Sequence, residues 1–385
     1  TGSGGTRPAQ PSTAYPAPGR HRVAGRRLLL PVITGGRAGI TGGGPMSPTA
    51  ARSTDGGPSS CPGIAVADGV DLTVDGTPLF FFGINAPFLL DNEFPEERAL
   101  ALVAEVAARG VNTVRVWFFH DEDPQRLARL LEAGRNHGVR FVVTLADNVF
   151  KGPEWFFGSD DEEEYRPHLR TTVSRFRDSP QVLLWEVMNE PNCGEAGVSA
   201  ACLKTMRDWL TMATRMVRAI DECHVVSTGM IGAGNRDDEA ENFRRIHRKD
   251  AVGIVSVHRP AGQQSADAVE FAADIRKPIF FGEVYDKAFD AGCQPLPGKD
   301  GPRGRSETIK RDLRWAMDNG VDGYILWDLA AGAVTRKNGD VKYYCGPFGY
   351  ALDDAVWDKL EAAGLPPPAP WTLGPAGSQG APDQD

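Results

Sequence analysis

The chain has 385 residues, of which 41% are hydrophobic and 24% charged, and its 51 acidic and 42 basic side chains give a net charge of −9. This composition is ordinary for a globular protein and excludes a chain that is disordered throughout. The acidic balance argues against a nucleic-acid or anionic-membrane binder, because both need a basic face. No stretch approaches the ~20 apolar residues that span a bilayer. The length suits either two or three small domains or one large α/β barrel of about 250 residues.

The two ends of the chain differ in composition from the middle. Residues 1–63 are rich in Gly, Pro and Arg and bury too little apolar surface to offset their ordering entropy, so we expect a disordered or processed leader there. A basic pair followed by a short apolar run at 28–33 leaves an export signal open. The Pro- and Gly-rich residues 365–385 predict a flexible tail. Residues 64–364 remain as the folded domain.

Within this domain, short apolar runs alternate with longer amphipathic stretches, which is the pattern of alternating strands and helices. Asp75-Gly76 predicts a β-hairpin that leads into the first strand. The later strands are predicted at residues 112–117, 139–145, 181–187, 225–229, 253–258, 278–282 and 323–327. The helices are predicted at residues 95–109, 124–137, 161–177, 199–220, 238–248, 267–276, 306–319 and 353–363.

Eight strand–helix units in one series predict an α/β fold, a (β/α)8 barrel with the hairpin at its bottom. The alternative is a doubly wound open sheet. That fold usually carries a G-x-G-x-x-G motif after the first strand, and the motif is absent from this sequence.

The chain has six cysteines and no C-x-x-C pair, which argues against a zinc knuckle or a thioredoxin-like redox site. Their even number favours disulfides and export. In a barrel, Cys193–Cys202 would close the loop after strand four, and Cys293–Cys345 would join the loops after strands seven and eight. Cys61–Cys223 would tie the segment before the hairpin to the start of strand five. We predict these three disulfides.

Barrels of this type carry their chemistry at the C-terminal ends of the strands, so ionisable residues there are the candidates. Strand four leads into Glu190, strand seven ends next to Glu283, and strand six ends at His258. Arg115 lies inside strand two, where an unpaired cation would be costly, so we expect a carboxylate to meet it. Two glutamates across one pocket can divide acid/base and nucleophilic work on a glycosidic bond. The alternative, that each glutamate only caps a helix or pairs with a surface arginine, explains fewer of these residues.

Together these residues resemble glycoside hydrolase family 5, a family of retaining β-glycosidases with a (β/α)8 barrel. The resemblance runs from residues 81–85 (FFGIN) to 324–327 (YILW). Residues 183–191 (LLWEVMNEP) look most like the strand-four motif of its endo-β-1,4-mannanases, and 114–117 (VRVW) and 144–148 (TLADN) point the same way. The resemblance implies a catalytic domain that cleaves a β-linked polysaccharide or oligosaccharide, and we expect β-1,4-mannan.

The resemblance also implies a role for each matching residue. Glu190 would be the general acid/base and Glu283 the nucleophile of a double displacement. Arg115 would hold Glu283 ionised, and Asn189 would bind the sugar 2-hydroxyl. The other substrate-binding residues that we predict are His258, Trp327 as the sugar platform, Trp117, Asn148 and Tyr285.

The chain departs from the family after strand six. The family usually has a Tyr two residues after the strand-six His, whereas this chain has His258-Arg259-Pro260. Tyr285, two residues beyond Glu283, is a candidate to reach the same space. Two alternatives therefore stay open, a β-glucanase, cellulase or other β-glycosidase of the same family and a non-catalytic sugar-binding barrel. A phosphate-binding barrel would want a Gly-rich turn after strands seven and eight, which this chain matches poorly.

Several expectations follow for the whole protein. Aromatic residues crowd the segments after strands two and three, among them Trp117 and Trp155, and sugar rings stack on such side chains. We expect a secreted monomer whose partner is a polysaccharide or oligosaccharide substrate. We expect no cofactor, no metal ion, no nucleic acid and no membrane partner.

Overall fold

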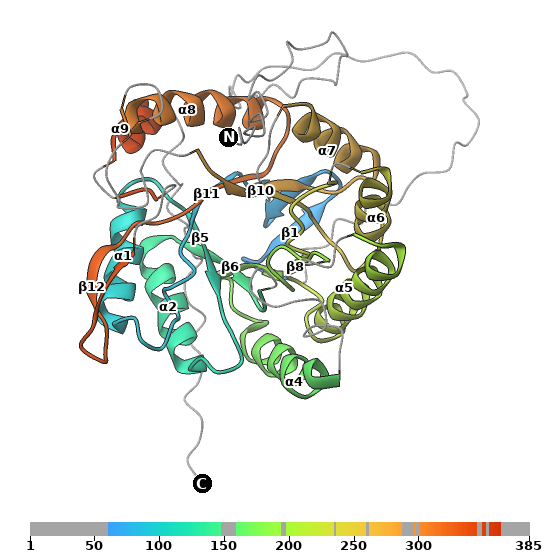
Figure 1. The fold of residues 1–385 in the computed structure, drawn as a ribbon, viewed down its shortest axis with the longest axis horizontal. Coiled ribbons are helices and arrows are strands. Elements are labelled where there is room, and N and C mark those ends of the chain that lie inside the picture. Colours follow the sequence, from blue (N-terminus) through green and yellow to red (C-terminus); the bar gives the residue numbers. More distant parts are fainter. Residues whose placement is uncertain are drawn as a thin grey trace, which may run out of the picture.

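The structure is a computed structural model that describes residues 61–147, 159–193, 198–234, 236–258, 262–286, 296–297, 301–344, 349–351 and 354–362. Eight strands form the central sheet: β4 (Phe81–Asn85), β5 (Thr113–Trp117), β6 (Arg140–Thr144), β7 (Val182–Glu186), β8 (Val225–Ser227), β9 (Val255–His258), β10 (Ile279–Val284) and β11 (Gly323–Leu326). The helices that surround them in Figure 1 are α1 (Glu96–Ala107), α2 (Pro124–His137), α4 (Ser159–Phe176), α5 (Ala200–Ile220), α6 (Asp237–His247), α7 (Gly262–Asp274), α8 (Pro302–Asp318) and α9 (Ala355–Ala362).

The sheet is a barrel of parallel strands. Its order is β8-β7-β6-β5-β4-β11-β10-β9, and every neighbouring pair is parallel. Two backbone hydrogen bonds bridge the seam between β8 and β9: Gly253 N–H donates to Val226 O at 2.9 Å, and His258 N–H donates to Ile231 O at 2.7 Å. The predicted (β/α)8 barrel is confirmed.

Strand side chains alternate between the barrel interior and the layer under the helices. Phe81 and Phe280 belong to the interior core, whereas their neighbours Phe82 and Phe281 belong to the larger core between strands and helices. Because both faces of a parallel strand are covered, its sequence reads as an unbroken apolar run. This explains why the strands could be predicted and why their inward faces could not.

A small antiparallel sheet closes the bottom of the barrel, as predicted. It consists of β1 (Ala65–Asp68), β2 (Asp71–Val74) and β3 (Thr77–Pro78). Asp75 and Gly76 both have positive φ, 49° and 76°, as a tight hairpin turn requires. The carboxylate of Asp322 ties this sheet to the barrel, because it accepts from Leu72 N–H at 2.8 Å and from Ile279 N–H at 3.0 Å.

One element was not predicted. The strands β12 (Gly332–Thr335) and β13 (Val341–Tyr344) form an antiparallel hairpin after the last barrel strand, beside α1 in Figure 1. Asn338-Gly339 lies in its turn, and Gly339 has φ 91°. This dipeptide is a strong hairpin signal. The flanking residues are largely exposed, so the periodicity that marks a buried strand is missing.

Two of the predicted disulfides, Cys61–Cys223 and Cys193–Cys202, are present. The third, Cys293–Cys345, lies outside the described residues, as do nearly all of the predicted leader and tail. None of the described helices is both long and apolar enough to cross a membrane.

Candidate active site

Glu190, Glu283 and His258 meet at the C-terminal ends of the barrel strands. Glu283 lies on β10 in register with His258 on β9, and Glu190 follows β7. One carboxylate oxygen of each glutamate and one ring nitrogen of His258 all lie within 4.8 Å of one another. Glu190 is 7% exposed and Glu283 is 4% exposed. Two carboxyl groups therefore face each other in a site with little access to water.

Arg115, on β5, joins this group from beneath and is fully buried. Its Nη1 donates to Glu283 Oε1 at 2.8 Å, and its Nε donates to Glu186 Oε1 at 2.8 Å. Burial alone would lower the pKa of Arg115, but the charges of Glu186 and Glu283 outweigh burial and raise the pKa. The expected carboxylate partner is present twice, and the guanidinium stays charged.

Sequence reasoning missed two residues of this network. Glu186 is fully buried and also accepts from Thr144 Oγ1 at 2.9 Å. Asn85 accepts from Arg115 Nη1 at 2.9 Å, and its Nδ2 donates to the carbonyls of Gly282 and Leu326, each at 3.0 Å. A charged residue inside an apolar strand was the available signal for Glu186. A polar residue at the end of a buried strand was the signal for Asn85.

The ionisation of Glu283 depends on opposing contributions. Burial raises the pKa of Glu283 above its usual range, His258 and Arg115 lower it, and Glu190 raises it again, so that the net pKa is raised. Arg115 thus acts in the direction that the family resemblance implies, towards an ionised Glu283. Burial of Glu283 acts in the opposite direction, because it favours the protonated form.

His258 lies between the two glutamates. Its Nδ1 is 3.2 Å from Glu190 Oε1 and 3.5 Å from Glu283 Oε1. The ring is buried, and its Nε2 has no hydrogen-bond partner among the described residues. A single ring nitrogen is therefore within reach of both carboxylates.

The backbone at Glu190 is held in an unusual conformation. Its φ is 45°, a left-handed value that is uncommon for a residue other than glycine. Its N–H donates to Gly229 O at 2.9 Å, and its carbonyl accepts from Asn192 Nδ2 at 2.8 Å. Such strain costs about 1–3 kcal/mol and is found preferentially where side chains must be aimed at a ligand.

Asn189 links the catalytic strand to its neighbours. Its Oδ1 accepts from Arg115 Nη2 at 2.7 Å, and its Nδ2 donates to Asp147 Oδ1 at 3.1 Å. Its backbone N–H donates to Ala146 O at 2.7 Å. An amide nitrogen carries two hydrogens, so the Asp147 contact leaves one N–H of Asn189 for a ligand.

The two tryptophans predicted to bind sugar lie edge to face, with ring centroids 5.7 Å apart and planes at 66°. Trp327 is partly exposed. Trp117 is 2% exposed, and the guanidinium carbon of Arg115 lies 4.3 Å from its ring centroid. One face of Trp117 is thus occupied by the protein. Tyr285 is partly exposed directly after β10, and Asn148, Trp155 and Arg259 lie outside the described residues.

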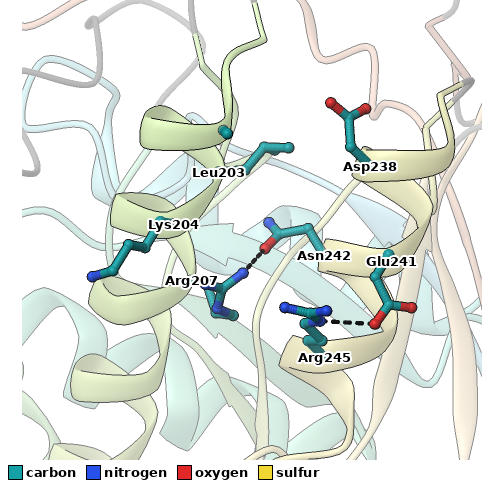
Figure 2. A pocket seen from close by; sticks show the side chains of 8 residues that line it. Leu203, Lys204, Arg207, Asp238, Glu241, Asn242 and Arg245 are labelled. Carbon is teal, nitrogen blue, oxygen red and sulfur yellow. Dashed lines mark hydrogen bonds and ion pairs between the residues drawn. The ribbon is translucent and has the colours of Figure 1, made fainter.

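Two pockets in the described part of the chain are candidate sites. A cavity of about 900 Å³ lies at the barrel mouth and is lined by both Trp117 and Trp327. A smaller one, about 360 Å³, lies between α5 and α6 on the outside of the barrel (Figure 2). In the smaller pocket Arg207 donates to Asn242 and Arg245 pairs with Glu241, so its polar groups largely satisfy one another. The cavity at the barrel mouth is therefore the better candidate for the active site.

Among the described residues, Glu190, His258 and Glu283 also lie close enough together to be potential ligands of one metal ion. Arg115 donates to Glu283 at 2.8 Å, and its positive charge would repel a cation bound there. The arrangement is better suited to moving protons and forming a covalent bond at a carboxylate than to holding a metal ion.

Comparison with known proteins agrees with this geometry. Residues 151–262 match the family described as "GH family 5 beta-mannosidase-like". A probable mannan endo-1,4-beta-mannosidase F of Neosartorya fischeri is 25% identical over 222 residues, which cover 46% of this chain and 47% of that protein. Mannan endo-1,4-beta-mannosidase 1 of Oryza sativa subsp. japonica is 28% identical over 217 residues, covering 44% of this chain and 49% of that protein. The chain spans about half the length of the curated relatives it matches.

Solved structures show the same fold. The endo-1,4-beta-mannanase of Rhizomucor miehei has a TM-score of 0.60 at 16% identity, covering 78% of this chain and 99% of that one. The endo-1,4-beta-D-mannanase of Thermotoga petrophila has a TM-score of 0.58 at 16% identity, covering 74% of this chain and 99% of that one. Together with the sequence matches, they confirm that this barrel resembles glycoside hydrolase family 5 and its β-mannosidase-like members.

Proposed function

We propose that the protein is a retaining glycoside hydrolase that cleaves β-1,4-mannan or its oligosaccharides. The observation that carries the proposal is the spacing of Glu190 and Glu283, whose nearest ligand oxygens lie within 4.8 Å. Retaining enzymes have carboxyl groups about 5–5.5 Å apart, whereas inverting enzymes separate them by roughly 6.5–9.5 Å to leave room for water. The relatives named as mannan endo-1,4-beta-mannosidases support mannan as the substrate.

In the first step, the carboxylate of Glu283 attacks the anomeric carbon while the carboxyl of Glu190 gives its proton to the departing glycosidic oxygen. The glycosidic bond breaks, an ester bond to Glu283 forms, and the leaving sugar departs as an alcohol. In the second step, Glu190 takes a proton from water, whose oxygen attacks the same carbon. The ester breaks, Glu283 regains its negative charge, and the product keeps the original anomeric configuration.

The surrounding residues support both steps. Arg115 donates to Glu283 and so favours its ionised form before attack. The remaining N–H of Asn189 is the donor for the sugar 2-hydroxyl, while its other contacts to Arg115 and Asp147 keep the side chain in one orientation. Trp327 offers a partly exposed ring on which the reacting sugar can stack.

The test is a hydrolysis panel of mannan, glucomannan, cellulose and xylan oligosaccharides of equal length. We expect mannooligosaccharides to be cut at least tenfold faster than cellooligosaccharides, a barrier difference of about 1.4 kcal/mol. NMR of the first product should show retained configuration. Glu283→Ala should lose nearly all turnover but still bind the substrate, whereas the surface change Glu241→Ala should keep full activity.

Each other outcome has a definite meaning. A reversed ratio of rates would make the protein a β-glucanase with the same two glutamates. Binding without hydrolysis of any substrate would make it a sugar-binding barrel, and an inverted product would overturn the assigned pair. We also propose that the protein is exported and acts as a monomer. The two disulfides support export, because disulfides persist in oxidising compartments.

A further inference from the structure

The smaller pocket lies on the outer wall of the barrel, between the first two turns of α5 and of α6 (Figure 2). Its lining residues recur with the three- and four-residue spacing of one helix face, such as Lys204 and Arg207 on α5 and Glu241 and Arg245 on α6. Among the described residues it shares none with the lining of the cavity at the barrel mouth. We call this space the α5–α6 pocket and treat it as separate from the active site.

One buried donor of the α5–α6 pocket lacks a protein partner. Arg207 Nη1 donates to Asn242 Oδ1 at 2.8 Å. Because a guanidinium has only donors, this contact turns the amide oxygen of Asn242 towards Arg207 and the amide nitrogen away from it, as Figure 2 shows. Asn242 is 2% exposed, and its Nδ2 makes no hydrogen bond to the described residues. A buried polar group without a partner is costly, and an acceptor on a ligand would remove this cost.

The positive charge of Arg207 also lacks a carboxylate partner. Of the other two basic residues in the lining, Lys204 pairs with Asp208, and Arg245 pairs with Glu241. Arg207 is half-buried, and within the described part of the chain its guanidinium contacts only the neutral amide oxygen of Asn242. A guanidinium has five N–H donors, so most of them stay available. The lining therefore offers a charged donor and, on the neighbouring side chain, a neutral one.

The size and the remaining polar groups of the pocket define the ligand further. Adjacent donors suit a carboxylate, which has two acceptor oxygens on one carbon. The volume of about 360 Å³ is much more than a bare ion needs, since one water molecule takes up about 30 Å³ in the liquid. The carboxylates of Asp238 and Glu241 can accept hydrogen bonds from ligand hydroxyl groups, and they would repel a second negative charge. A ligand with one carboxylate, several hydroxyl groups and the size of a monosaccharide meets all of these conditions.

We propose that the α5–α6 pocket binds one uronic acid unit. Arg207 and Asn242 hold its carboxylate, and Asp238 and Glu241 accept from its hydroxyl groups. The same chemistry is present in a free sugar acid and in a uronic acid unit of a polysaccharide. Such a site on the outer wall goes beyond the proposed function and does not depend on hydrolysis at the mouth.

The first test compares ligands by titration calorimetry at low ionic strength. Galacturonate and galactose differ only at C6, which carries a carboxylate in the first and a hydroxymethyl group in the second. We expect galacturonate to bind at least tenfold more tightly, and the difference should shrink at high salt because salt screens the charge of Arg207. Butyrate, which lacks hydroxyl groups, and sulfate, which has two charges, should each bind at least tenfold more weakly than galacturonate. Binding of galactose, butyrate or sulfate as tight as that of galacturonate would overturn the inference.

A trimer of galacturonate distinguishes the two sources of the ligand. Binding of the trimer at least as tight as that of the free sugar acid would assign the pocket to a unit of a polysaccharide. Binding of the free sugar acid alone would assign it to the monosaccharide. If neither binds, the inference fails.

The second test uses variants of the two donor residues. Asn242→Asp removes the free amide donor and gives Arg207 a carboxylate partner inside the protein, so galacturonate should bind at least tenfold more weakly. Arg207→Gln should cause a similar loss without burying a new charge. Arg215→Gln is the matched control and should bind as the wild type does, because Arg215 is an exposed arginine of α5 outside the pocket. Glu283→Ala should also keep the binding. Wild-type affinity in Arg207→Gln, or a loss of binding in Glu283→Ala that places the ligand at the mouth, would overturn the inference.

Discussion

The ring of His258 occupies the space that a side chain at position 282 would fill. A β-carbon on Gly282 would lie 2.9 Å from His258 Nε2 and 3.0 Å from its Cδ2. Gly282 directly precedes Glu283, and the register of β10 against β9 shifts between Phe281 and Glu283. The absence of a side chain at this irregular point therefore allows His258 to lie beside both glutamates.

Gly282→Ala should displace the ring of His258 without replacing either glutamate. Misplacement of catalytic groups by about 1 Å can cost roughly a hundredfold in rate, so we expect kcat to fall at least tenfold with KM changed little. Gly253→Ala is the matched control, because its β-carbon would lie as close, 2.9 Å from Val225 Cγ1, but at the β8–β9 seam. Equal losses of kcat in both variants would mean that general packing, and not the His258 position, is responsible.

Glu186 should matter for rate although it is no candidate for contact with the substrate. Its carboxylate holds the Arg115 guanidinium from below, so Glu186→Gln would loosen the arginine that donates to Glu283. We expect kcat to fall at least tenfold. Because Arg115 lowers the pKa of Glu283, loosening this arginine should raise that pKa further, so the acidic limb of the kcat/KM profile should move to higher pH. A profile that moves to lower pH would contradict this arrangement.

The sequence predicted the parts of the site that stand at strand ends. Glu190 and Glu283 could be found because an ionisable residue at the end of an apolar run marks the active face of a barrel. Glu186 and Asn85 lie on strands that are buried on both faces, and such strands carry no alternation that tells which residues point inward. Their contact with Arg115 joins β4, β5 and β7, and only the folded barrel brings these strands together.

Neither the contacts of the Trp117 ring nor the β12–β13 hairpin could be predicted from the periodicity of the sequence. Trp117 was expected to bind sugar through its ring, but Arg115 lies over one face, an arrangement that follows from strand pairing and not from spacing. The helices were easier to predict. For example, α2 starts with Asp123 capping the N–H of Gln125 and ends before Gly138, whose φ is 70°, and these signals are local in sequence.

Stability should fall in mild acid because of buried histidines. Burial lowers the pKa of His247 to about 4, and its ring contacts Phe243 O at 3.0 Å and Thr228 Oγ1 at 3.2 Å. The unfolded chain therefore takes up a proton first. The stabilisation is complete above pH ~6.5 and is lost as the pH falls towards 4, by about 2 kcal/mol between pH 6.5 and 5.

Urea unfolding at pH 7 and pH 5 measures this loss. The variant His247→Gln should be less stable than the wild type at pH 7 but should lose less stability between the two pH values. His137→Gln, an exposed residue at the end of α2, is the control and should keep the wild-type pH dependence. Parallel losses in all three proteins would assign the acid sensitivity to other groups.

We expect the two disulfides to contribute differently to stability and to activity. Cys61–Cys223 spans 162 residues and ties the segment before β1 to the start of β8, whereas Cys193–Cys202 spans 9 residues directly after Glu190. Loop-closure entropy values the first at about 5 kcal/mol and the second at about 2.5 kcal/mol. Replacing Cys61 and Cys223 by alanine should therefore lower the free energy of unfolding more than replacing Cys193 and Cys202.

For kcat we expect the opposite order, with the larger loss when Cys193–Cys202 is removed. Cys193 is three residues from Glu190, whose left-handed backbone depends on hydrogen bonds to Gly229 and Asn192. Freeing the adjacent chain should let this strained conformation relax, so the Cys193→Ala/Cys202→Ala variant should lose several-fold in kcat at a temperature where both variants stay folded. The Cys61→Ala/Cys223→Ala variant should keep its kcat there, because its disulfide lies at the opposite end of the barrel. Denaturation midpoints and kcat on mannan, measured on the same preparations, test both orders. A larger loss of kcat in the Cys61→Ala/Cys223→Ala variant would show that the disulfide at the bottom of the barrel controls the rigidity of the mouth.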